Sequence, residues 1–96
     1  MKMNNNSEKG ELKLMLTDSG GREVSVGCDS VRLVAMDGTD GRGGGSIGIR
    51  QGHIKSVIAL EKGDVIAYRS GEIVFSENIC GGVAVVDSDT VTILSD

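Results

Sequence analysis

Short runs in which every second residue is aliphatic recur along the whole chain, separated by turns rich in glycine. In the first run, Leu12, Leu14 and Leu16 share one face of an extended segment. A period of two is typical of a β-strand with one buried face, and no stretch shows the period of an amphipathic helix. The sequence therefore predicts an all-β fold whose core is built from the aliphatic faces of strands.

Two of these runs are joined to the next by turns typical of β-hairpins, at Asp18–Gly21 and at Ser70–Gly71. The spacing of the runs is typical of a sandwich or barrel. We therefore expect a two-sheet antiparallel β-sandwich of about nine to ten short strands. The runs cover residues 12–17, 23–28, 31–35, 46–50, 56–60, 65–69, 72–79, 83–86 and 90–94.

The length of 96 residues allows one domain with one modest core. Tyr68 and Phe75 are the only aromatic residues, and the 15 glycines with no proline indicate many turns. Valine, isoleucine and leucine must therefore fill the core, which suits strands. Residues 1–10 are polar and are expected to form a flexible tail, so the predicted domain covers residues 11–96.

Charge and composition exclude several classes of protein. The net charge of −4 argues against a phosphate-binding surface, since nucleic-acid binders usually carry a basic stripe. No apolar run approaches the roughly 20 residues that span a bilayer, and no signal-peptide pattern follows Met1. Cys28 and Cys80 are too few for a disulfide framework, so we expect free thiols on the apolar faces of strands, in a reducing compartment.

Three features suggest chemistry, and each is incomplete. Asp37–Gly41 has the composition of a calcium loop but lacks the remaining acidic ligands, and a solvated loop accounts for it. Gly41–Ser46 lacks the lysine and the following helix of a phosphate loop. His53 is the only histidine and has no evident nucleophile or additional metal ligands, which favours a structural or interface role. We therefore expect no catalytic, cofactor or metal site.

Several motifs, taken in order, resemble the epsilon subunit of F-type ATP synthases. Val31–Val34 precedes a glycine-rich loop, after which Ile47-Gly48-Ile49 and Gly52-His53 are similar to the family's Leu/Phe-Gly-Ile-Leu-Pro-Gly-His. The run at 80–86 resembles its Gly-Gly-aliphatic strand, and the end at 89–96 resembles its Val-Thr-Ile-Leu-Ala-Asp ending. The resemblance covers residues 12–96, and the order of the motifs makes it specific.

The chain departs from the family at several positions. Arg50-Gln51 replaces the usual Leu-Pro, Ser46 stands where an acidic residue is common, and the loop before Ile47 is longer and richer in glycine. The family usually continues into a two-helix hairpin beyond the position of Asp96. A short-type epsilon subunit and a chain cut at the domain end both fit this pattern.

The resemblance implies a non-catalytic central-stalk subunit that binds gamma, touches the c ring and couples ion flow to ATP synthesis. It implies a place at the cytoplasmic face of a bacterial inner membrane, reached only through the complex. Thr17 and His53 would contact gamma. We also expect the loop at 41–46 and the turn at 51–53 to share one rim facing the c ring. The implied c-ring residues are Gly43, Gly44, Gly45, Ser46, Arg50 and Gln51.

A stand-alone β-sandwich adaptor that binds a peptide or small ligand is the alternative function. Both readings draw on strands that are apolar on both faces, at Val57–Leu60 and at Val65-Ile66. If their second face is exposed, it indicates an interface. If neighbouring loops cover this second face, the two segments are simply central strands of the fold.

Overall fold

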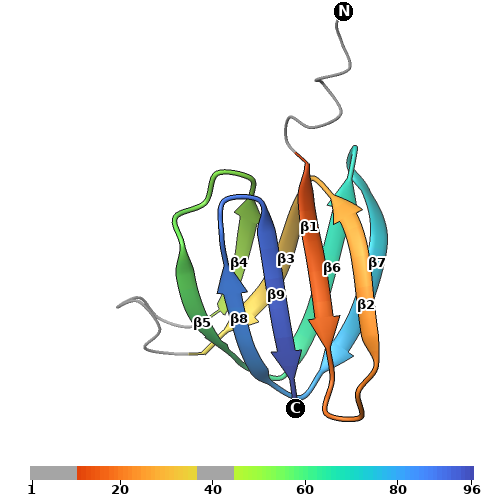
Figure 1. The fold of residues 1–96 in the computed structure, drawn as a ribbon, viewed down its shortest axis with the longest axis vertical. Helices are drawn as coiled ribbons and strands as arrows, with labels where there is room; N and C mark the ends of the chain where they lie inside the picture. The colour runs from red at the N-terminus through yellow and green to blue at the C-terminus, as the bar shows by residue number, and fades with distance from the viewer. Residues whose placement is uncertain (1–10, 37–44) are drawn as a thin grey trace, which may run out of the picture.

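The computed structural model describes residues 11–36 and 45–96, and this part of the chain contains nine β-strands and no helix (Figure 1). The predicted all-β class is confirmed, and each predicted strand lies within two residues of an observed one. The expected tail at 1–10 lies outside the described residues. The strands are β1 (Leu12–Thr17), β2 (Glu23–Cys28), β3 (Ser30–Ala35), β4 (Gly45–Arg50), β5 (Ser56–Leu60), β6 (Gly63–Arg69), β7 (Glu72–Ile79), β8 (Gly82–Val86) and β9 (Thr90–Ser95).

The strands form one continuous sheet that folds over itself into two layers. Its order is β2-β1-β9-β8-β5-β3-β6-β7, with β4 also paired to β3. In Figure 1, β2, β1, β9, β8 and β5 make the front layer, and β4, β3, β6 and β7 make the back layer. No helix in the described ranges could cross a bilayer.

A narrow link between β3 and β5 joins the two layers, where the sequence predicted two separate sheets. The strands share one residue pair, Ala35 with Leu60. Two backbone bonds flank it, from Met36 N to Ala59 O at 2.9 Å and from Glu61 N to Val34 O at 3.0 Å. The sheet is continuous because β3 ends beside β5 after pairing with β6 along its first half.

The opposite edges of the folded sheet, β2 and β7, lie next to each other. The Arg22 guanidinium forms an ion pair with Glu77 across this seam, and that pair holds the pKa of Arg22 above its ordinary value. At the other end, Arg69 Nη2 lies 3.1 Å from Glu11 Oε1. These exposed pairs add little stability individually, but each links parts of the sheet that share no ladder of backbone bonds, the first at the β2–β7 seam and the second between the end of β6 and the start of β1.

The first and last strands, β1 and β9, pair in parallel, whereas the sequence predicted antiparallel neighbours throughout. Leu14 pairs with Val91 and Leu16 with Ile93. No short turn connects these two strands, so nothing local fixes their relative direction. Their pairing places both ends of the domain in the middle of the front layer.

The core lies between the layers and is aliphatic, as the alternation predicted. Cys28 is also buried there, and Phe75 packs against the core from its edge. Cys80 is instead exposed, because it lies at the bend that precedes β8 rather than on the inner face of a strand. The largest fully buried side chains are Leu12, Leu14, Leu16, Leu33, Ile49, Ile93, Val31, Val65, Val86 and Val91.

We expect Gly82→Ala to destabilise the domain by about 3 kcal/mol, because this backbone conformation is strained for any other residue. Gly82 has a φ of +144°, and a Cβ atom there would lie 2.2 Å from Leu94 O. Chemical denaturation measures the loss. Gly48→Ala is the matched control, since open space surrounds Gly48, and it should change stability by less than about 0.5 kcal/mol. Equal stabilities of the two variants would contradict the observed backbone.

We expect native protein to react with Ellman's reagent through Cys80 alone, with Cys28 reacting only after unfolding. Burial raises the pKa of the Cys28 thiol, and the carboxylates of Asp29 and Glu11 raise it further. Its Sγ donates a hydrogen bond to Leu12 O at 3.5 Å. The Cys80→Ser variant should therefore be unreactive in the native state.

The Cys28 thiol makes the free energy of unfolding depend on pH. Because the folded pKa of Cys28 lies above its unfolded value, its stabilising contribution is complete below the unfolded pKa. That contribution is lost as the pH rises from about 8.5 through the folded pKa. A Cys28→Ala variant should lack this alkaline loss, and an identical profile in the two proteins would refute the assignment.

Candidate protein interface

The outer surface of the front layer carries two rows of outward-facing residues that cross four strands. The strand registers align β5, β8, β9 and β1, and directly paired side chains lie roughly 4.5–5.5 Å apart at Cβ. We call this surface the apolar face. One row is Val57, Val85, Thr92 and Met15, and the other is Ala59, Val83, Leu94 and Thr17.

The apolar face is exposed rather than covered by neighbouring segments. Val57 is 70% exposed and Leu94 is 53% exposed, and Met15, Val83 and Val85 are also exposed. The same strands send Ile58, Ala84 and Ile93 into the core. These strands are therefore apolar on both sides, and the second side meets solvent in the isolated chain.

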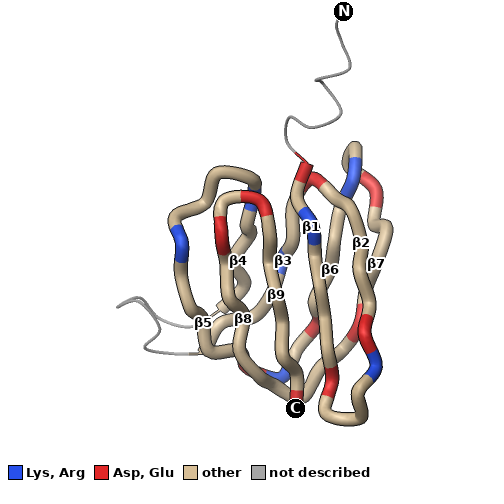
Figure 2. Tube along the Cα trace, in the orientation of Figure 1, with Lys and Arg blue, Asp and Glu red and all other residues tan. Residues whose placement is uncertain are grey.

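Charged residues border the apolar face and are missing from its middle. Figure 2 shows no charged position along the central lengths of β8 and β9. Lys13 lies at the start of β1, while Asp87 and Asp89 lie in the turn between β8 and β9. A neutral apolar centre with a charged border is the usual anatomy of a protein–protein interface.

Thr17 and His53 lie at opposite ends of the front layer. Thr17 is the last residue of β1 and is half-buried. It belongs to the row that also contains Ala59, Val83 and Leu94, and it pairs with Leu94. His53 follows β4 in the turn at the other end, where Gly52 N donates to Ser88 O at 2.6 Å. A partner that contacts both residues must therefore extend along the strands.

His53 is half-buried, and both of its bonds are made within its own turn. Its backbone N–H donates to Arg50 O at 3.2 Å, and its Nδ1 lies 2.8 Å from Ile54 O. In the described part of the chain, no group of three or more His, Cys, Asp or Glu residues could hold a metal ion. The calcium-like segment at 37–41 lies outside the described residues.

The residues expected to share one rim facing the c ring lie at opposite ends of β4. Gly45 and Ser46 begin this strand, and Arg50 and Gln51 stand at its other end. Six extended residues span roughly 17 Å, and β4 stays in register with β3 over its whole length. The expectation of a shared rim is therefore wrong. Gly43 and Gly44 lie outside the described residues.

Sequence reasoning missed Met15, Val83, Val85 and Leu94 as members of the apolar face. Their signal was present, because each is an apolar residue at a position of a strand that alternates with the core positions. Which strands are neighbours, and hence whether such residues form one surface, depends on the order of the strands in the sheet.

No protein-family model matches this chain, and no curated protein matches it. Its fold is similar to that of a chain in the cryo-EM structure of the central stalk and c ring of the Tetrahymena thermophila mitochondrial ATP synthase. The TM-score is 0.58 at 19% sequence identity, and the match covers 88% of this chain. The match covers 62% of the Tetrahymena chain, so the present chain spans less than two thirds of the length of that chain. The likeness shows a shared fold.

Proposed function

We propose that this chain is a non-catalytic central-stalk subunit of an F-type ATP synthase, of the epsilon type, and that its apolar face binds the gamma subunit. The observation that carries the proposal is the neutral apolar face across four strands. The order of the epsilon-like motifs supports it, as does a fold similar to that of a chain in a central-stalk and c-ring structure.

The chemistry of the apolar face suits a permanent partner better than a transient one. A stable interface buries about 800 Å² on each side, and its centre is apolar with few charges. A subunit that turns with the stalk needs a rigid surface rather than an active site. A continuous β-sheet supplies such a surface, with Thr17 and His53 marking the two ends of the contact.

Only one end of the domain would then contact the c ring, because the residues expected to make this contact lie at the two opposite ends of β4. We assign that contact to the end that carries Gly45 and Ser46, which are exposed. At the other end, Gly52 N and His53 N already donate to Ser88 O and Arg50 O. In this arrangement the chain works at the cytoplasmic face of a bacterial inner membrane and reaches the membrane only through the complex.

We expect Leu94→Glu to weaken binding to the gamma subunit at least tenfold, because a carboxylate buried in an apolar interface lacks a partner. Isothermal titration with purified gamma measures the affinity. Ile73→Glu is the matched control, since Ile73 is 58% exposed and lies on β7 in the back layer.

Both substitutions replace exposed side chains and should leave the free energy of unfolding within about 0.5 kcal/mol of the parent. If Leu94→Glu and Ile73→Glu bind gamma equally well, the apolar face does not form this interface. If the parent protein itself fails to bind gamma, the stand-alone adaptor becomes the better account of the chain.

We expect a photo-crosslinker attached at Ser46→Cys to label c subunits in the assembled complex, and one at Gln51→Cys to leave them unlabelled. Both variants are made in a Cys80→Ser background, since Cys80 is exposed and would take up the reagent. Mass spectrometry identifies the labelled subunit. Labelling of c subunits from Gln51→Cys alone would reverse the assigned orientation.

A further inference from the structure

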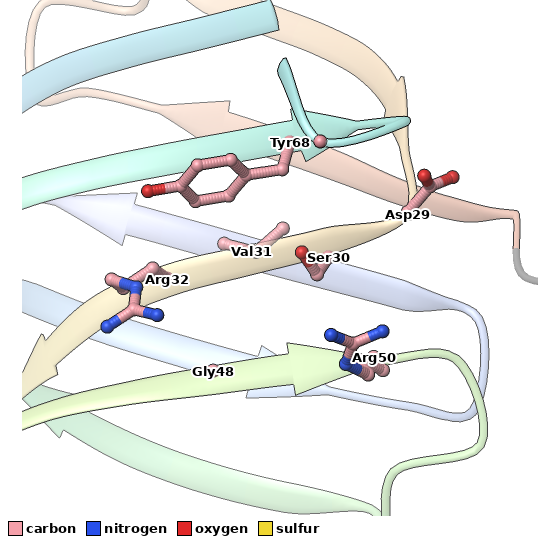
Figure 3. A pocket seen from close by; sticks show the side chains of 8 residues that line it. Asp29, Ser30, Val31, Arg32, Gly48, Arg50 and Tyr68 are labelled. Carbon is pink, nitrogen blue, oxygen red and sulfur yellow. The ribbon is translucent and has the colours of Figure 1, made fainter. Parts of the chain in front are cut away.

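A cavity of about 350 Å³ opens on the outer surface of the back layer, away from the apolar face (Figure 3). Strands β4, β3 and β6 form it, together with the turn between β6 and β7. Its polar side chains come from Arg32, Arg50, Tyr68, Ser30 and Asp29. None of the functions considered above uses this group of residues together.

The strand registers explain why these side chains meet. Ser30 on β3 pairs with Arg50 on one side and with Tyr68 on the other. Arg32, two residues further along β3, pairs with Gly48. Arg32 and Arg50 are therefore diagonal neighbours across two strands, a relation that places their Cα atoms roughly 7–8 Å apart.

Gly48 leaves the space between the two arginines open. A Cβ atom at this position would meet nothing within 4 Å. Figure 3 shows the two guanidinium groups on either side of Gly48, and the Tyr68 side chain along β6, across β3 from Gly48. The cavity therefore has an uncovered floor flanked by two cationic groups.

Among the described residues that line this cavity, two arginines stand against one carboxylate, that of Asp29 at the rim. Arg32 Nη1 donates to Ser46 Oγ at 3.3 Å, and no described acidic side chain forms a salt bridge with Arg32 or Arg50. The Asp29 carboxylate at the rim accepts a hydrogen bond from Ser70 N at 2.6 Å, which engages it with the turn. The two guanidinium groups, which the described residues leave without an acidic partner, therefore outnumber the one carboxylate, and they mark a local site for an anion in a chain of net charge −4.

We propose that this cavity binds a small phosphate monoester, with Arg32 and Arg50 holding the phosphoryl oxygens above Gly48. The planar guanidinium fork matches phosphate geometry, and two cations match the double charge of the phosphate better than the single charge of a carboxylate. The cavity has room beyond one phosphate group, and the Tyr68 ring offers an apolar surface to the rest of the ligand.

The site is independent of the proposed rotor function, because it lies on the layer opposite the apolar face. Loss of gamma binding in Leu94→Glu would leave it intact, and loss of phosphate binding would leave gamma binding intact. It also gives Arg50 a role different from the c-ring contact expected from the sequence.

The test is a titration of the ¹⁵N-labelled protein with inorganic phosphate and with phenyl phosphate, at low ionic strength, followed by NMR. Both ligands are expected to shift the amide signals of Ser30, Arg32, Gly48 and Arg50. Acetate and benzoate serve as single-charge comparators and are expected to bind at least about fivefold more weakly. Tighter binding of phenyl phosphate than of inorganic phosphate would assign the site to phosphorylated small molecules, and the reverse order to free phosphate.

Arg32→Gln and Arg50→Gln should each weaken phosphate binding about tenfold, the loss expected for one charge-assisted hydrogen bond. Gly48→Val keeps both charges but fills the floor, and it should weaken binding as much. Lys62→Gln removes an exposed cation elsewhere and should have no such effect. The proposal is overturned if the arginine variants bind phosphate like the parent, if Lys62→Gln weakens binding equally, or if acetate binds as tightly as phosphate.

Discussion

The parallel pairing of β1 with β9 is the contact on which the rest of the front layer depends. On its inner side, Leu14 and Ile93 are fully buried in the core. On its outer side, Met15 and Leu94 belong to the apolar face. The same ladder thus supplies both the stability of the domain and its candidate interface, so a change that separates these two strands would remove both. Surface substitutions on the outer side can nevertheless probe the interface without disturbing the core.

The two outer surfaces of the domain differ in chemistry because the outward-facing positions of their strands hold different types of residue. The front layer presents valine, leucine and methionine at its centre. The back layer presents Arg32, Arg50 and Tyr68 around an open cavity. A net charge of −4 describes the average of the whole chain and gives no information about such a local excess of positive charge. One small sheet can therefore carry a protein interface and an anion site without overlap.

The proposed rotor role and the architecture fit together physically. A stalk subunit transmits position rather than performing chemistry, and a sheet folded into two layers resists deformation through its backbone ladders. This continuity is interrupted at the β3–β5 link and at the seam between β2 and β7. Both lie away from the centre of the apolar face, where the strands pair residue by residue.

The sequence by itself determined the nine strands, their turns and most of the core, because alternation and turn residues are local signals. Only the tertiary structure decided the parallel partnership of β1 and β9, the link between layers, and the exposure of Cys80. It also showed that Gly45 and Gln51 lie apart, because they stand at opposite ends of β4. Strand order is set by contacts between residues far apart in the chain, and it alone turned scattered apolar positions such as Val57 and Leu94 into one surface.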